Sequence, residues 1–249
     1  DEIDEMLRAG RREAAREHWG FRRIWGTRWT RRLLLIGLVL GVGDQVTGIN
    51  TAMYYTPQVL RAAGFSSIDS ITLPVISGGI AALGAMANLW AVGRFARRHV
   101  GIYQEGAIVV CLTALAGVFH FLIEPHQGAD GDIDASAVPA FAPVLVLVII
   151  CLFVFSKQSG TVSWVLISEL FPSRIRGTAV GMAIGVLWIA NAAVAVVFPP
   201  MMDHLGGAAT YLVFAAMNVG TLLFYWRVVP ETRGSSLEEL ESRFARRYR

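Results

Sequence analysis

Six long runs of apolar residues alternate with short polar connections along the chain. We place these runs at 33–60, 71–92, 101–122, 141–167, 177–199 and 208–229. A helix needs roughly 20 residues to cross a hydrocarbon core of about 30 Å, and backbone polar groups in lipid must be hydrogen-bonded within the segment. The pattern therefore predicts an all-α membrane protein, with six transmembrane helices forming a bundle over residues 33–229.

Polar segments flank these runs. Residues 1–32 are rich in arginine and predict a cytoplasmic linker with a helix over 2–17, either solvated or lying on the lipid surface. Residues 230–249 predict a cytoplasmic tail, in which a capping-box spacing precedes a short amphipathic helix. Between the third and fourth runs, the Gly, Asp and Pro content of 124–140 predicts an exposed loop.

The composition and the charge distribution agree with a membrane protein. Of all residues, 54% are hydrophobic and 16% are charged, and both cysteines lie in apolar runs, where neither a disulfide nor a thiolate metal site is expected. The helix count places 20 of the 22 lysines and arginines on one side. Because basic residues mark cytoplasmic loops, we expect a multi-pass protein of the cell membrane with both termini in the cytoplasm. No basic patch interleaved with aromatic residues suggests nucleic-acid binding.

Polar side chains at membrane depth gather in three places. Charges inside a bilayer are costly, so such residues usually face a cavity or a partner. The three places are the stretches GDQVTGINTAMYY, FSKQSGTVSW and VLWIAN. Their candidate residues are Asp44, Gln45, Asn50, Tyr54, Tyr55, Lys157, Gln158, Trp164, Trp188 and Asn191.

The first stretch contains two amides that a straight helix would keep apart. At about 100° per residue, Gln45 lies roughly 140° around the helix from Asn50, whereas Asn50 and Tyr54 share a face. Gly48, between the amides, offers a place to bend or unwind the helix. Discontinuous helices of this kind form midplane substrate sites in transporters. The alternative is that the amides only bond neighbouring helices as packing contacts.

Lys157 lies near the middle of its apolar run and needs a partner or a water-filled cavity. Asp44 is the most economical partner, because a buried acid and a buried amine offset each other's desolvation. The alternative is that each contacts water in a central cavity. Trp164 and Trp188 could belong to an interfacial aromatic belt or stack on a ligand.

Five motifs in register resemble those of the sugar porters, a branch of the major facilitator superfamily. DQVTGINTAMYY is similar to the family's QQxxGINxxxYY, and GRFARR to its D-R-x-G-R-R loop. GTVSWVLISELFPSRIRG is similar to G-P-x-x-W followed by S-E-x-F-P-x-x-x-R-G, and WIANAAVAVVFPP and PETRGSSLEELE complete the set. The resemblance covers essentially the whole chain, and it is to the C-terminal six-helix half of such a transporter.

This resemblance implies a sugar site lined by polar and aromatic groups. Amides can meet the paired donors and acceptors of sugar hydroxyls, and an indole can cover the apolar face of the ring, as the resemblance implies for Trp164. The candidate substrate-binding residues are Asp44, Gln45, Asn50, Tyr54, Trp164, Trp188 and Asn191.

The resemblance also implies a charged network at the inner face. In the family such charges hold the outward-facing state and separate when the bundles rock, and arginine–carboxylate pairs suit a reversible latch. A simple positive-inside anchor would explain the arginines but not Glu169. The candidate gating residues are Arg94, Arg97, Arg98, Glu169, Arg174 and Arg176.

Several positions depart from the family pattern. The first family glutamine is Asp44 here, the residue before Trp188 is Leu187, and Lys157 is unexpected. These changes remove hydroxyl contacts to a common hexose. A cyclitol, a different sugar or a cationic solute that uses Asp44 therefore remains open.

The sequence thus predicts transport of a sugar or sugar-like polyol by alternating access, together with a second, N-terminal six-helix half. We expect no enzymatic activity, no cofactor and no metal site. Proton coupling is open, because the acid and arginine credited with it in the family belong to the other half. The alternatives are a porter for a non-sugar solute such as an organic cation, and a half-transporter remnant that does not transport.

Overall fold

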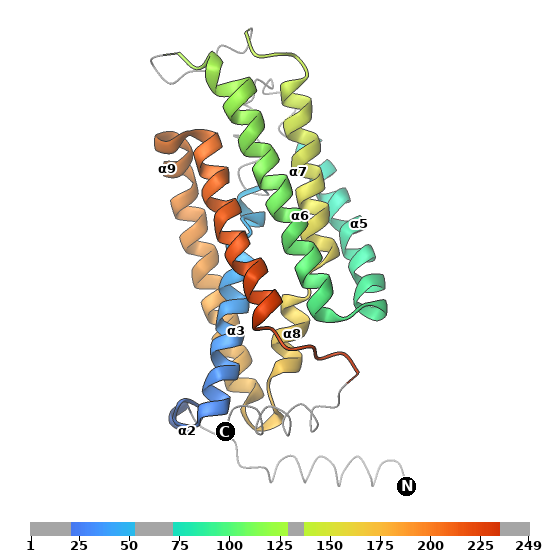
Figure 1. The fold of residues 1–249 in the computed structure, drawn as a ribbon, viewed down its shortest axis with the longest axis vertical. Coiled ribbons are helices and arrows are strands. Elements are labelled where there is room, and N and C mark those ends of the chain that lie inside the picture. The colour runs from blue at the N-terminus through green and yellow to red at the C-terminus, as the bar shows by residue number, and fades with distance from the viewer. Residues whose placement is uncertain (1–20, 53–71, 129–136, 235–249) are drawn as a thin grey trace.

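The computed structural model describes residues 21–52, 72–128 and 137–234 and shows a bundle of long helices (Figure 1). The short α2 (Phe21–Gly26) leads into α3 (Arg28–Val46). The next three helices are α5 (Thr72–Arg94), α6 (Arg97–Val118) and α7 (Ala142–Ser159). The chain then forms α8 (Ser163–Leu170) and the very long α9 (Ser173–Arg227).

The long α9 consists of two antiparallel helices. Gly206 has a φ of 80°, in the left-handed region, and the chain reverses direction at the top of Figure 1. The carboxylate of Glu124, at the end of the turns that extend α6, accepts a hydrogen bond from Ala208 N at 2.8 Å. It thereby caps the start of the returning helix, where free N–H groups favour an anion. With α7 and α8 counted as one crossing and α9 as two, the described residues contain the six membrane helices that the apolar runs predict.

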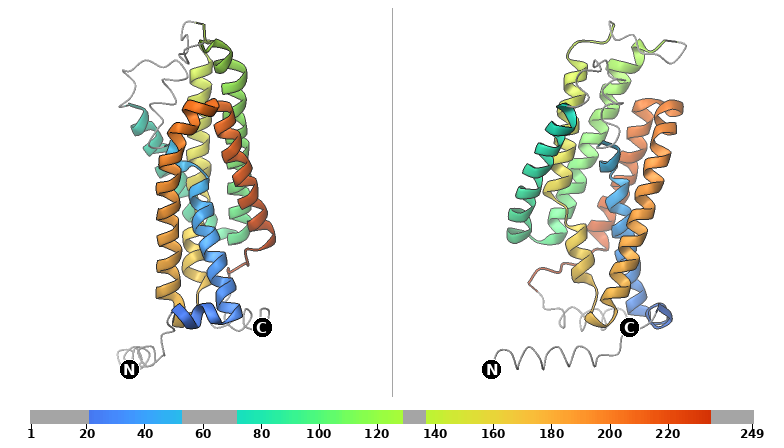
Figure 2. Two further views of the ribbon diagram at one scale, coloured as in Figure 1. Left: turned by 90° about the vertical axis from the view of Figure 1, so that its left-hand side faces the viewer. Right: turned by 180° about the vertical axis from the view of Figure 1, so that it is seen from behind.

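Two apolar clusters hold the bundle together at different heights. One contains Leu40 of α3 with residues of α8 and both parts of α9, and the other contains Ile49 with residues of α6, α7 and α9. The polar residues Asp44, Gln45 and Thr47 lie between Leu40 and Ile49 along the chain. Figures 1 and 2 show α5, α6 and α7 side by side, with α3 and α9 packed beside them. Apolar side chains such as Leu89 and Ile189 point outward, as suits a surface that faces lipid or a second bundle.

The helices differ from the predicted runs in two places. The first begins at Arg28, earlier than 33, and is interrupted after Val46. The fourth run is split at Gly160 into α7 and α8, which the apolar pattern did not indicate. The helices predicted over 2–17 and in the C-terminal tail lie outside the described residues.

Candidate functional site

The helix of the first polar stretch breaks at Gly48, as its sequence predicts. Gly48 has a φ of 78°, and helical structure resumes at Ile49. Thr47 Oγ1 donates to Asp44 O at 2.8 Å, and Asn218 of α9 donates to the freed carbonyl of Val46 at 3.0 Å. The backbone groups released by the break are therefore bonded inside the protein, which is the condition for irregular structure at membrane depth.

The break brings together the two amides that a straight helix would separate. Asn50 Nδ2 donates to Gln45 Oε1 at 2.6 Å and to Asn191 Oδ1 of α9 at 3.0 Å. Neither Asn50 Oδ1 nor Asn191 Nδ2 has a hydrogen-bond partner within the described ranges. An acceptor and a donor are thus left beside each other, and this is the pair that a hydroxyl group can engage.

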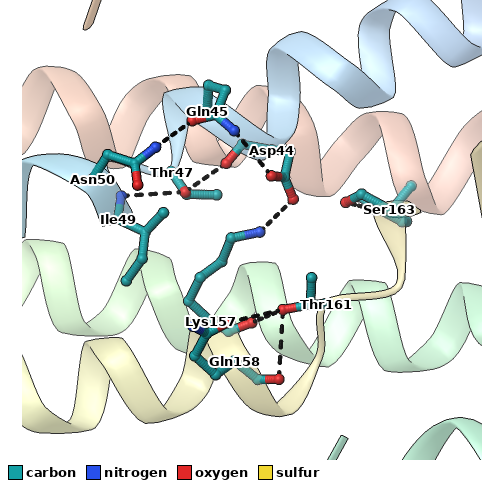
Figure 3. Close-up of polar contacts among 10 residues, drawn as sticks. Asp44, Gln45, Thr47, Ile49, Asn50, Lys157, Gln158, Thr161 and Ser163 are labelled. Atoms are coloured by element: carbon teal, nitrogen blue, oxygen red, sulfur yellow. Dashed lines mark hydrogen bonds and ion pairs between the residues drawn. The ribbon is translucent and has the colours of Figure 1, made fainter. Parts of the chain in front are cut away.

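Lys157 of α7 reaches across to this stretch, and Figure 3 shows it pointing toward Asp44. The two groups form an ion pair, with Lys157 Nζ 2.5 Å from Asp44 Oδ1 and their side chains only 3% and 5% exposed. Gln45 Nε2 donates to Asp44 Oδ2 at 3.2 Å, which links the ion pair to the amides. The pairing predicted from the sequence is therefore present, and a continuous hydrogen-bonded chain runs from Lys157 to Asn191.

The split between α7 and α8 begins just after Lys157 in the chain. Thr161 Oγ1 donates to the Lys157 carbonyl at 2.7 Å, satisfying a group that the interruption releases (Figure 3). In the amide orientation that satisfies both of its polar atoms, Gln104 of α6 accepts from Lys157 Nζ at 3.2 Å and donates to the Gly160 carbonyl. Gly160 is required here, because a Cβ would stand 2.4 Å from Gln104 Cβ.

Three further polar side chains, which the sequence argument missed, join this region. Glu105 of α6 is 1% exposed, and its Oε2 is buried with no hydrogen-bond partner among the residues described. Ser163 and Tyr225 share a hydrogen bond of 2.9 Å between their hydroxyls. A signal for Glu105 was available in the sequence, since it is a carboxylate within the apolar run 101–122.

The remaining candidate residues are not part of this hydrogen-bonded chain among the described residues. Trp164 of α8 is 41% exposed and Trp188 of α9 is 57% exposed, and neither has a ring contact in the described part of the chain. Both indoles are thus partly exposed, and their part in binding stays a prediction. Tyr54 lies outside the described residues. A largely apolar hollow of about 410 Å³ lies between α5, α6 and α7 and adjoins the site at Gln104 and Gly160.

At the end of the bundle that the sequence predicts to be the inner face, one arginine–carboxylate pair joins two of the predicted gating residues. Arg97 Nη2 lies 3.1 Å from Glu169 Oε1, linking the start of α6 to α8. The other oxygen, Glu169 Oε2, accepts from Thr232 Oγ1 of the PETRG segment at 2.6 Å. One carboxylate oxygen of Glu169 therefore accepts from Arg97 of α6, and the other accepts from Thr232 of the PETRG segment.

The other inner-face arginines bind backbone groups or aromatic rings. Arg98 donates to the carbonyls of Tyr225 and Trp226, Arg176 to that of Phe171 at 3.1 Å, and Arg94 lies over the Trp90 ring. The side chain of Arg174 lies outside the described residues.

Glu231 is an inner-face member that the sequence argument did not single out. Its two carboxylate oxygens accept from Arg97 N and Arg98 N at 3.0 and 3.1 Å. The carboxylate thus caps α6 at its N-terminus, where the helix dipole favours a negative charge.

Comparison with known proteins decides what kind of bundle this is. A model of the family described as "Sugar (and other) transporter" matches residues 1–244. The chain belongs to this sugar transporter family. The major myo-inositol transporter IolT of Bacillus subtilis (strain 168) is 32% identical over 219 residues, covering 87% of this chain and 43% of that protein. The D-xylose-proton symporter of Escherichia coli (strain K12) is 31% identical over 220 residues, covering 84% and 41%.

A solved structure shows the same fold for this half-bundle. The proton:xylose symporter XylE, bound to 6-bromo-6-deoxy-D-glucose, matches with a TM-score of 0.71 and 28% identity, over 90% of this chain and 45% of that chain. The protein is therefore an all-α membrane protein with the fold of one half of a major facilitator superfamily transporter. It spans less than half the length of these sugar transporter relatives.

Proposed function

We propose that this chain forms the solute-binding half of a transporter that moves a sugar or polyol across the cell membrane by alternating access. The observation that carries the proposal is the amide chain at the Gly48 break. Among the described residues, it leaves an acceptor on Asn50 and a donor on Asn191 unpaired and side by side. A sugar or cyclitol offers many hydroxyls, each a donor and an acceptor, which is the chemistry that such a pair matches.

The solute class is further supported by the two relatives. One is named a myo-inositol transporter and the other a D-xylose symporter, and both solutes are rings bearing several hydroxyls. The exposed faces of Trp164 and Trp188 would cover the apolar side of such a ring. An organic cation is less suited to the site, because Lys157 already neutralises Asp44.

Alternating access requires a second bundle that rocks against this one about the central site. We propose an N-terminal six-helix half as that partner, facing the exposed tryptophans. The Arg97–Glu169 pair and its neighbours would hold the inner face closed in one state and separate in the other. On this view both termini of the chain lie in the cytoplasm, beside the basic inner connections.

Uptake of labelled myo-inositol and D-xylose by cells expressing the complete transporter tests this function. We expect one of them to accumulate, and Asn50→Ala and Trp164→Ala each to abolish most of that uptake. Trp226→Ala is a matched control, since this indole is exposed at the end of α9, where its ring contacts Arg227 and its backbone carbonyl accepts from Arg98. The proposal fails if neither solute is taken up and neither substitution changes the uptake of any solute tested.

A further inference from the structure

Among the described residues, the buried polar cluster contains more carboxyl groups than ammonium groups. Asp44 on α3 and Glu105 on α6 are carboxyl groups that are 5% and 1% exposed, and the one ammonium near them is that of Lys157 on α7. The remaining titratable group that faces them is the Tyr225 hydroxyl on α9, which is neutral and bonded to Ser163. Among the described residues, the cluster would therefore hold one uncompensated negative charge if both carboxyls were ionised.

The geometry assigns the compensated charge to Asp44. Its two oxygens are bonded to Lys157 Nζ at 2.5 Å and to Gln45 Nε2 at 3.2 Å. Glu105 Oε2, in contrast, is buried without any described hydrogen-bond partner. An isolated buried carboxylate costs several kcal/mol or more, and such groups neutralise by binding a proton or a cation.

We propose that Glu105 is a proton-binding site of this transporter and that its proton is coupled to the solute site through Lys157 and Asp44. The inference deepens the proposed sugar or polyol transport and rests on it only for the coupling. The reaction is a simple acid–base step, in which a proton from water binds the Glu105 carboxylate and is later released to water. In the protonated state Glu105 is neutral, and the negative charge of Asp44 is balanced by the Lys157 ammonium.

The hydrogen-bonded chain supplies a physical route for the coupling. When Glu105 loses its proton, its carboxylate competes with Asp44 for the Lys157 ammonium. Asp44, held less by Lys157, then accepts more strongly from Gln45 Nε2 and shifts the Gln45 amide, whose Oε1 accepts from Asn50 Nδ2 at 2.6 Å. The amides that present the free donor and acceptor to a hydroxyl therefore sense the protonation of Glu105. Lys157 also adjoins the split between α7 and α8, where a change of its position can move α8.

Infrared spectra of the purified transporter test the proton site without any solute, when the spectrum of each variant is subtracted from that of the wild type. At neutral pH we expect a carboxylic-acid C=O band that is lost in Glu105→Gln and retained in Glu124→Gln. Glu124 is the matched control, a glutamate beyond the end of α6 whose carboxylate caps the returning part of α9. A band that persists unchanged in Glu105→Gln overturns the proposal.

Isotope labelling gives the same answer if Glu105→Gln does not fold. The wild-type band should shift when glutamate is labelled with ¹³C and stay in place when aspartate is labelled. A shift with labelled aspartate alone assigns the proton to an aspartate and overturns the proposal.

Transport in proteoliposomes tests the coupling, with myo-inositol and D-xylose as the probes. In Glu105→Gln we expect equilibrium exchange of the transported solute to persist, while accumulation driven by a pH gradient and solute-induced proton uptake are lost. Accumulation equal to that of the wild type, or accumulation driven by a sodium gradient instead, overturns the coupling. If the wild type moves neither solute but the infrared band behaves as expected, the proposed function fails and the proton site stands.

Discussion

Lys157 Nζ lies 2.5 Å from Asp44 Oδ1, and this buried contact joins two helices through residues 113 positions apart in the chain. Removing one partner of a buried ion pair leaves an uncompensated charge, which costs about 3–5 kcal/mol, whereas replacing both is far less harmful. Each residue of the pair therefore needs the other to compensate its buried charge.

A double-mutant comparison follows from this relationship. Lys157→Met alone should lower the thermal stability and the transport rate more than Lys157→Met combined with Asp44→Asn, because the double change leaves no unpaired charge. Thermal unfolding in detergent and solute uptake measure the two effects. Equal losses in the single and double variants would contradict an energetic coupling between the residues.

Gly48→Ala should destabilise the protein and reduce solute binding. A side chain at a φ of 78° costs about 1–2 kcal/mol, and the added Cβ would meet Phe214 Cδ1 at 3.1 Å. Gly117→Ala is the control, since a Cβ there meets no other group and an alanine suits the interior of α6. If thermal unfolding shows the same stability for both variants, the break at Gly48 is not a conformational requirement.

Asn191→Ala should weaken solute binding while leaving the stability nearly unchanged. The substitution removes Asn191 Nδ2, a donor unpaired among the described residues, and Asn191 Oδ1, which accepts from Asn50 Nδ2. One hydrogen bond contributes about 1 kcal/mol, or roughly a fivefold change in Kd. Titration with the transported solute, beside a thermal unfolding curve, separates the two effects. A loss of stability with unchanged affinity would mean that Asn191 serves packing alone.

Glu169→Gln should open the inner face more readily. The neutral amide weakens the 3.1 Å contact with Arg97 while keeping the size of the side chain. Labelling of a single cysteine introduced at the inner end of the cavity should become faster, and Asp203→Asn, at an exposed acid on α9, should leave it unchanged. An unaltered labelling rate in Glu169→Gln would remove the latch role from this pair.

Glu231→Ala should lower the stability without touching the solute site. Its carboxylate accepts from the first two N–H groups of α6, and the loss of such a cap costs about 1 kcal/mol. Glu231→Gln, which keeps an acceptor oxygen but not the charge, should recover part of the loss. The midpoint of thermal unfolding measures this order, and a wild-type midpoint in Glu231→Ala would show that the cap is unimportant.

Local features of the sequence were sufficient to predict the membrane helices and the break in the first of them. Apolar runs of membrane-spanning length leave few alternatives to helices, because lipid cannot bond to free backbone groups. Gly48 between two amides indicates the break because glycine alone adopts a positive φ without a steric cost. The family motifs further predict which residues line a solute site and which form an inner network.

The tertiary structure alone decided which further buried groups meet the Lys157–Asp44 pair. Both sides of a membrane helix are apolar, so hydrophobic periodicity does not fix how each helix is rotated against its neighbours. Glu105 could therefore be noticed in the sequence as a charge at membrane depth, but not placed beside Lys157 and Asp44. Their meeting depends on close packing of α3, α6 and α7, which Gly160 permits by leaving room for Gln104.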